Sequence, residues 1–127
     1  MAETKFYRCI HCGNIITFLH SSGVPVMCCG EKMQELAANT SDGAAEKHVP
    51  VAAVAEKTVT VSVGSVAHPM LAEHYIQWIC LETTAGVQFK YLEPGNDPKA
   101  LFSLADGEKP VAAYAYCNLH GLWKTDI

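Results

Sequence analysis

The middle of the chain contains the segment Lys57-Thr58-Val59-Thr60-Val61-Ser62-Val63, whose side chains alternate strictly between polar and apolar from Thr58 onward. In an extended strand, valines at every second position lie on one face. Segments rich in aromatic and β-branched residues follow at residues 75–81, 87–92, 101–104 and 111–116, and Gly, Pro and Asp residues separate them. Short strands at this spacing predict an antiparallel β-sandwich or barrel, which we place at residues 47–127.

Residues 1–36 form a small module of a different kind. A chain of about 36 residues cannot bury enough apolar surface to fold alone, and it usually needs a metal, disulfides or oligomerisation. Residues 37–46 are small and polar, which is typical of a linker. We therefore expect a first domain at residues 1–36, a linker at 37–46 and the β-domain at 47–127.

Composition and charge limit the classes of protein to which the chain can belong. It has 127 residues, of which half are apolar and 17% are charged, as in ordinary globular proteins. Its formal net charge of −4 argues against nucleic-acid binding. No segment approaches the roughly 20 apolar residues of a membrane helix. Because the N-terminal region contains cysteines and polar residues instead of the apolar run of a signal peptide, we expect a cytoplasmic protein.

Four cysteines lie in the first module, as Cys9-x2-Cys12 and Cys28-Cys29. In a reducing cytoplasm, clustered cysteines indicate metal ligands before disulfides. Four thiolates favour a tetrahedral zinc or iron site, and the spacing alone neither separates these metals nor excludes a structural zinc knuckle. Because neighbouring side chains of an extended chain point apart, Cys28 and Cys29 require a local bend, for which Gly30 is suited.

A second set of metal-binding side chains lies in the predicted β-domain: His48, His68, His74, Cys117 and His120. A single histidine is more often a hydrogen-bonded core or surface residue than a ligand. Together, however, these five donors exceed the four that structural zinc usually takes, and they suit an iron with one open position. A thiolate opposite that position would push electron density onto bound oxygen, as it does in thiolate-ligated haem.

Longer motifs surround these side chains and cover the chain from about Tyr7 to Lys124. They are Tyr7-x-Cys9-x2-Cys12-Gly13-Asn14, Cys28-Cys29-Gly30, Glu46-Lys47-His48-Val49-Pro50, Gly64-Ser65-Val66-Ala67-His68-Pro69-Met70, His74-Tyr75-Ile76-x-Trp78 and Tyr116-Cys117-Asn118-Leu119-His120-Gly121-x-Trp123-Lys124. In these motifs the chain resembles the two-iron superoxide reductases, also called desulfoferrodoxins. The resemblance implies a desulforedoxin- or rubredoxin-like metal module, an immunoglobulin-like antiparallel β-sandwich, iron at both sites and a homodimer.

The same resemblance implies roles for individual residues. The implied equatorial ligands of the catalytic iron are His48, His68, His74 and His120. Cys117 matches the axial thiolate, Glu46 the carboxylate that occupies the sixth position in the oxidised resting state, and Lys47 the cation beside the open site. The implied activity is the one-electron reduction of superoxide to hydrogen peroxide at ferrous iron, which an external donor such as rubredoxin re-reduces.

Formal charge favours the second site for this chemistry. One thiolate and neutral imidazoles leave ferrous iron with a net positive charge that attracts superoxide, and Lys47 adds to the attraction. Four thiolates give the first site a net negative charge and no open position, so it can only pass electrons or hold structure. The residues alone leave three other functions open: a zinc-ribbon interaction module fused to a sandwich, a superoxide dismutase, and an electron carrier.

Overall fold

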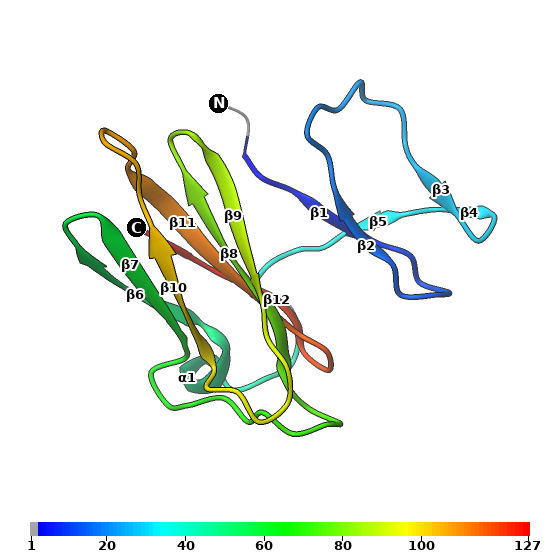
Figure 1. Cartoon of the computed structure of the whole chain (residues 1–127). Coiled ribbons are helices and arrows are strands. Elements are labelled where there is room, and N and C mark those ends of the chain that lie inside the picture. Colours follow the sequence, from blue (N-terminus) through cyan, green and yellow to red (C-terminus); the bar gives the residue numbers. More distant parts are fainter. Residues whose placement is uncertain (1–2) are drawn as a thin grey trace. The chain divides into compact units, whose positions relative to one another are not determined.

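The protein forms two compact units, Met1–Ala37 and Ala38–Ile127, in a computed structural model that describes residues 3–127 (Figure 1). Both units consist of short antiparallel strands joined by turns. Within the described residues the only helix is α1 (Ala45–His48). The predicted fold class, mainly β, is confirmed.

The first unit combines a three-stranded sheet of order β2-β1-β5 with a separate β3-β4 hairpin. Its strands are β1 (Phe6–Arg8), β2 (Ile15–Thr17), β3 (Met27–Cys28), β4 (Glu31–Lys32) and β5 (Gln34–Glu35). Among the described residues of this unit, the buried apolar side chains are Phe6, Cys9 and Met33. So small a core agrees with the expectation that a metal stabilises the module.

The second unit is a sandwich of two antiparallel sheets. One sheet has the order β10-β7-β6 and the other the order β12-β11-β8-β9. The strands are β6 (Pro50–Ala55), β7 (Thr58–Val63), β8 (Ile76–Thr83), β9 (Gly86–Tyr91), β10 (Lys99–Ser103), β11 (Pro110–Cys117) and β12 (Gly121–Asp126). Along the chain, β6 and β7 lie in the first sheet, β8 and β9 in the second, β10 in the first again, and β11 and β12 in the second. This distribution of strands is that of an immunoglobulin-like sandwich.

The hydrophobic core of the second unit lies between its two sheets. Val59, Val61 and Val63 of β7 are fully buried, which confirms the alternation predicted from the sequence. The core also contains Phe102 of β10 and, from the facing sheet, Ile79, Leu81, Ala113, Ala115 and Cys117. Each fully buried valine contributes about 1.5–3 kcal/mol of transfer free energy. Because Cys117 ends β11, this core extends directly to a side chain of the second metal set.

The sequence patterns do not predict β6 and β12. Half of the residues of β6 are alanine, and β12 ends in polar residues, so neither strand shows a clear apolar alternation. The pairing of β8 with β11 is irregular at two places, and the one nearer the end of β11 lies in β8. Tyr116 pairs with Trp78 and Cys117 with Ile76, which leaves Gln77 as an extra residue in β8.

Residues 37–46 are predicted as a linker, but the structure assigns nearly all of them to the second unit. Asn39 donates its backbone N–H to the carbonyl of Leu122 at 3.0 Å. Its side-chain amide accepts the N–H of Lys124 at 2.9 Å and donates to the carbonyl of the same residue at 3.2 Å. The small polar side chains of this segment therefore fasten it to the edge strand β12. The domain limits 1–36 and 47–127 themselves stay a prediction.

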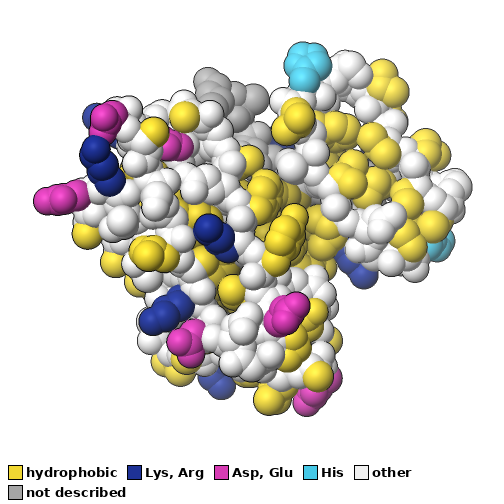
Figure 2. Space-filling model, viewed as in Figure 1, with side chains coloured by type: hydrophobic (Ala, Val, Ile, Leu, Met, Phe, Trp, Pro, Cys, Tyr) yellow, Lys and Arg dark blue, Asp and Glu magenta, His cyan; other side chains and the backbone are white. Residues whose placement is uncertain are grey.

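The described surface carries charges of both signs. On the face drawn in Figure 2, basic and acidic side chains are interspersed and do not gather into one patch of a single sign. Between residues 3 and 127, no helix has the length and the apolar character that a membrane crossing requires.

Candidate metal centres

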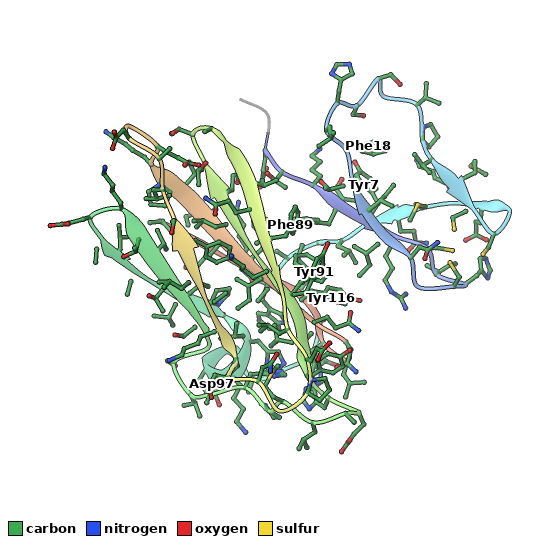
Figure 3. All side chains as sticks on the ribbon, in the orientation of Figure 1. Tyr7, Phe18, Phe89, Tyr91, Asp97 and Tyr116 are labelled. Carbon is green, nitrogen blue, oxygen red and sulfur yellow. The ribbon has the colours of Figure 1, made fainter. Side chains whose placement is uncertain are left out.

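The four cysteines of the first unit converge. The sulfur atoms of Cys9, Cys12, Cys28 and Cys29 all lie within 4.8 Å of one another. Figure 3 shows sulfur atoms gathered beside the turn between β3 and β4. The predicted four-sulfur set is therefore present, and it comes from two short turns.

The first turn brings Cys9 and Cys12 together. Gly13 donates its N–H to the carbonyl of Cys9 at 3.0 Å, and it adopts a φ of +82°, which favours glycine. The backbone N–H of Cys12 points at the sulfur of Cys9 at 3.5 Å. Such N–H groups stabilise a thiolate.

The second turn allows the adjacent residues Cys28 and Cys29 to direct their sulfur atoms to the same site. Cys28 pairs with Glu31 across the β3-β4 hairpin, so Cys29 and Gly30 form a two-residue loop. Both have positive φ, at +52° and +75°, which is the backbone of a type I′ turn. The expected bend at Gly30 is confirmed. Cys29 is part of the same bend, because its backbone also adopts the left-handed conformation. The two neighbouring sulfurs can therefore face the same point.

The protonation of these thiols indicates a site that needs a cation. The pKa of Cys9 is lowered to about 6, chiefly because the backbone N–H of Cys12 points at its sulfur. The pKa of Cys29 is raised to about 12, chiefly because the sulfurs of Cys12 and Cys9 crowd it. Four thiolates this close repel one another, and a bound metal ion removes the repulsion.

The second set converges at one end of the sandwich. The donor atoms of His48, His68, His74 and Cys117 all lie within 4.8 Å of one another. They come from α1, the loop after β7, the segment before β8 and the end of β11. His48 and His68 are each 3% exposed and Cys117 is fully buried. Only the folded sandwich brings these four segments together.

Two of the imidazoles are oriented by hydrogen bonds to the backbone. The ring Nδ1 of His48 donates to the carbonyl of Ala44 at 2.8 Å, and Nδ1 of His68 donates to the carbonyl of Pro69 at 2.6 Å. A carbonyl can only accept, so Nδ1 carries the proton and Nε2 is left with a free lone pair. The two Nε2 atoms lie 3.1 Å apart. This is the usual second-sphere arrangement of histidines that bind a metal.

The imidazole of His74 shows whether the site is suited to a metal ion. Nε2 of His74 is buried, and within the described chain it has no hydrogen-bond partner. A buried polar atom without a partner costs free energy. A metal ion held by the converging donors satisfies this atom, so the residues present fit a metal centre.

The same burial sets the protonation that a metal requires. Burial lowers the pKa of His48, His68 and His74, to about 4 for His68. The imidazoles are therefore neutral near pH 7 and ready to act as ligands. Burial raises the pKa of Cys117, and the N–H groups of Leu119 and His120 partly offset this rise. The thiol ionises more readily when a cation is bound beside it.

His120 lies beside this set without being one of the four mutually close donors. Its ring centroid is 4.9 Å from that of His48 and 5.2 Å from that of His74. Trp123 donates its indole N–H to the carbonyl of His120 at 3.0 Å and stacks on His48 at 5.0 Å. Ser41 also donates its hydroxyl to the His120 carbonyl. The loop that carries His120 is thus held beside the four converging donors.

Glu46 and Lys47 directly precede His48 in α1, and both are exposed. The carbonyl of Glu46 accepts the N–H of Val66 at 2.8 Å. Gly64 is also tight against this backbone, because a Cβ there would lie 2.5 Å from the same carbonyl oxygen. After burial and the neighbouring histidines, the positive charge of Lys47 is a further cause of the lowered pKa of His48 and His74.

Three residues that position this set are not marked by any pattern in the sequence. Asn118 hydrogen-bonds to both neighbours of His74, Gly64 admits the backbone of α1, and Trp123 packs on His48. All three lie in the quoted motifs, next to or near a predicted ligand. Their contacts join segments that are distant along the chain, so no periodicity or spacing could reveal them.

A four-sulfur centre and a separate histidine–cysteine centre at the end of an immunoglobulin-like sandwich define a two-centre metalloprotein. Family models match nearly the whole chain: "Desulfoferrodoxin, N-terminal domain" at residues 2–36 and "Desulfoferrodoxin" at residues 40–126. The chain belongs to the desulfoferrodoxin family. The two side-chain sets correspond to the two iron centres of that family.

Individual relatives agree with this assignment. Desulfoferrodoxin of Nitratidesulfovibrio vulgaris is 48% identical over 124 residues, which cover 98% of this chain and 97% of that protein. The solved superoxide reductase of Treponema pallidum is 38% identical with a TM-score of 0.83, and the match covers 98% of this chain and all of that one. A one-iron superoxide reductase of Giardia intestinalis is 35% identical with a TM-score of 0.56, and it covers 65% of this chain and 97% of its own.

Proposed function

We propose that the chain is a superoxide reductase whose second centre reduces superoxide to hydrogen peroxide. The observation that carries the proposal is the convergence of the donor atoms of His48, His68, His74 and Cys117. It occurs in a family whose solved relatives include superoxide reductases. Ferrous iron, when bound, supplies the single electron that converts superoxide and two protons into hydrogen peroxide.

In this proposal five side chains hold that iron: His48, His68, His74, His120 and Cys117. His120 is included because its ring lies against those of His48 and His74. The neutral imidazoles leave the positive charge of the metal largely intact, which favours an anionic substrate. Cys117 adds electron density to the metal as an anionic sulfur ligand.

Lys47 and Glu46 have separate parts in the proposal. Lys47 attracts superoxide toward the site, and the effect of its charge on the pKa of His48 and His74 supports an electrostatic reach of this kind. Glu46 would offer its carboxylate as a further ligand to the oxidised metal. Both side chains are exposed, so they are free to move toward a substrate or away from it.

An external donor returns the electron, and rubredoxin is the proposed donor. The four-cysteine centre either passes electrons or stabilises its own module, because four thiolates leave no position for a substrate. We place the protein in the cytoplasm. None of the six cysteines forms a disulfide, which agrees with a reducing compartment.

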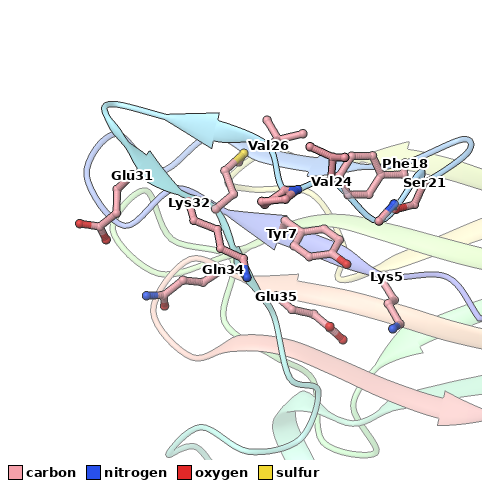
Figure 4. A pocket seen from close by; sticks show the side chains of 13 residues that line it. Lys5, Tyr7, Phe18, Ser21, Val24, Val26, Glu31, Lys32, Gln34 and Glu35 are labelled. Carbon is pink, nitrogen blue, oxygen red and sulfur yellow. The ribbon is translucent and has the colours of Figure 1, made fainter.

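We also propose a homodimer. The first unit has a groove of about 680 Å³ (Figure 4). Its lining includes the apolar side chains of Tyr7, Phe18, Val24 and Val26, and also Lys5, Lys32, Glu31 and Glu35. A surface with both signs of charge around an apolar centre can pair with its own copy across a two-fold axis. Sedimentation equilibrium tests this proposal: a dimer mass that Lys32→Glu reduces toward the monomer is expected, and a monomer for the unmodified chain contradicts it.

The enzymatic proposal is tested by metal analysis and rapid mixing. The purified protein is expected to contain iron at both centres and to absorb visible light. On mixing with superoxide, the reduced second centre should be oxidised in a second-order reaction, and rubredoxin with its reductase should sustain turnover. A colourless zinc protein that does not react would contradict the proposal and favour the zinc-ribbon alternative.

A further inference from the structure

We infer that Asn118 is a positioning residue of the second centre, whose side-chain amide fixes the segment carrying His74 against the strand end carrying Cys117. The inference rests on the proposed iron site and adds a residue outside its ligand set. The two segments are distant in sequence, because residues 73–75 precede β8 whereas Asn118 follows β11.

Asn118 binds the two residues that flank His74. Its Nδ2 donates to the carbonyl of Glu73 at 3.0 Å, and its Oδ1 accepts the N–H of Tyr75 at 2.9 Å. Its backbone N–H donates to the carbonyl of Tyr75 at 3.2 Å. One residue, adjacent to Cys117, thus holds the chain on both sides of His74.

These hydrogen bonds extend the β8-β11 ladder beyond its last pair, Cys117 with Ile76. A side-chain amide offers a donor and an acceptor, as a peptide group does, so Asn118 can replace a missing strand residue. The segment it holds has little regular structure of its own. It is otherwise closed by an isolated bridge, in which the backbones of Leu71 and His74 exchange hydrogen bonds of 2.9 and 3.1 Å.

His74 depends on this backbone support more than His48 and His68 do. The rings of His48 and His68 are each oriented by a hydrogen bond from Nδ1 to a carbonyl. In the described chain the ring of His74 makes no such bond, and its buried Nε2 has no protein partner. The direction of this Nε2 is therefore set by where the flanking backbone is held.

Asn118→Asp is the sharpest change at this position. It keeps the size of the side chain and the oxygen that accepts the N–H of Tyr75, but it replaces the donor to Glu73 with a second acceptor. Two facing acceptors repel, so the segment before β8 is released. Loss of a second-sphere hydrogen bond typically lowers metal affinity about 10- to 100-fold.

Asn39→Asp is the matched control. Asn39 holds Lys124 of β12 with the same pair of bonds, an acceptor at 2.9 Å and a donor at 3.2 Å. The substitution therefore makes the same chemical change in the same unit. Asn39 flanks none of the proposed ligands.

The test is iron release from the full-length protein. The unmodified protein and both variants are loaded with ferrous iron and dialysed against a concentration series of one chelator. We expect N118D to lose the second-centre iron at about 10- to 100-fold lower chelator concentration, with the four-cysteine iron retained. N39D should retain both irons like the unmodified protein. The midpoint potential of the second centre should shift in N118D alone.

Equal iron release and equal midpoint potentials in N118D and N39D would overturn the inference. A second variant, Asn118→Ala, and circular dichroism of the metal-free proteins show whether a substitution at this position prevents folding. If metal-free N118D and N118A both lose the β-spectrum that metal-free N39D keeps, Asn118 is a residue of the fold, and the inference is wrong. None of these measurements uses superoxide, so an unmodified protein that does not consume superoxide contradicts the proposed function alone.

Discussion

The two metal centres are built in opposite ways. The first takes its cysteines from two turns, at residues 9–13 and 28–30, in a unit with very few buried apolar side chains. The second takes its donors from four separated segments that meet at the end of a well-packed sandwich. The metal therefore stabilises the first unit, whereas the fold of the second unit prepares the site for its metal.

The largest expected effect separates the two centres by activity. Cys117→Ser replaces the buried sulfur ligand of the second centre, and we expect the rate of superoxide reduction to fall on the order of 100-fold or more. Cys29→Ser removes a ligand of the first centre and should leave that rate within about threefold, because four thiolates offer no position for a substrate. Rapid mixing of each reduced variant with superoxide measures both rates. Equal losses in the two variants would mean that the first centre takes part in the reaction.

Metal removal should separate the two units by structure. We expect chelation to expose the backbone amides of residues 6–35 to rapid hydrogen exchange, because Phe6, Cys9 and Met33 alone form too small a core. The amides of β7, β8 and β11 should stay protected, since their core is apolar and needs no metal. Hydrogen exchange with mass spectrometry before and after chelation makes the comparison. Loss of protection in β7 and β8 would contradict a sandwich that folds without its metal.

A smaller effect is expected from the charge beside the second centre. Lys47→Met should slow the second-order reaction with superoxide by about 3- to 10-fold and weaken its dependence on ionic strength. Lys57→Met is the matched control, because it makes the same change in net charge. Lys57 precedes the opposite end of β7, which is about 20 Å long. Equal rates in the two variants would contradict the proposal that Lys47 attracts superoxide to the site.

The smallest effect concerns the pH dependence of the metal-free sandwich. Burial lowers the pKa of His68 from 6.5 to about 4 in the folded protein. Between these values the unfolded chain binds more protons than the folded one, so the free energy of unfolding should fall as the pH drops from about 6.5 toward 4. Above this range His68 is neutral in both states and has no effect. Urea unfolding at several pH values measures the slope, which His68→Gln should reduce; an equal slope in both proteins would exclude this role of His68.

The sequence predicts the difference between the two units where that difference depends on residues close together in the chain. The alternation at Val59, Val61 and Val63 identifies the sandwich, and the Cys9-x2-Cys12 spacing identifies the first centre. β6 could not be predicted, because half of its residues are alanine and it has no polar and apolar alternation. The hydrogen bonds between Asn39 and Lys124 of β12 leave no pattern in the sequence, because small polar residues are equally typical of a linker.

The metal-binding side chains of the second centre can be predicted from the sequence, but the residues that hold them in position cannot. Its histidines stand out through the motifs around them, and the structure brings three of them together with Cys117. Asn118 and Gly64 act through contacts with segments more than ten residues away. Such contacts follow from the sandwich topology and leave no periodic trace in the sequence.

The most direct test of the account is the oxygen yield of the reaction at the second centre. Reduced protein is mixed with a known amount of superoxide, and dissolved oxygen and hydrogen peroxide are measured together. A superoxide reductase yields one hydrogen peroxide for each superoxide consumed and releases no oxygen, and we expect this result. Release of one oxygen for every two superoxide ions consumed would identify a dismutase, and the protein would then not be a superoxide reductase.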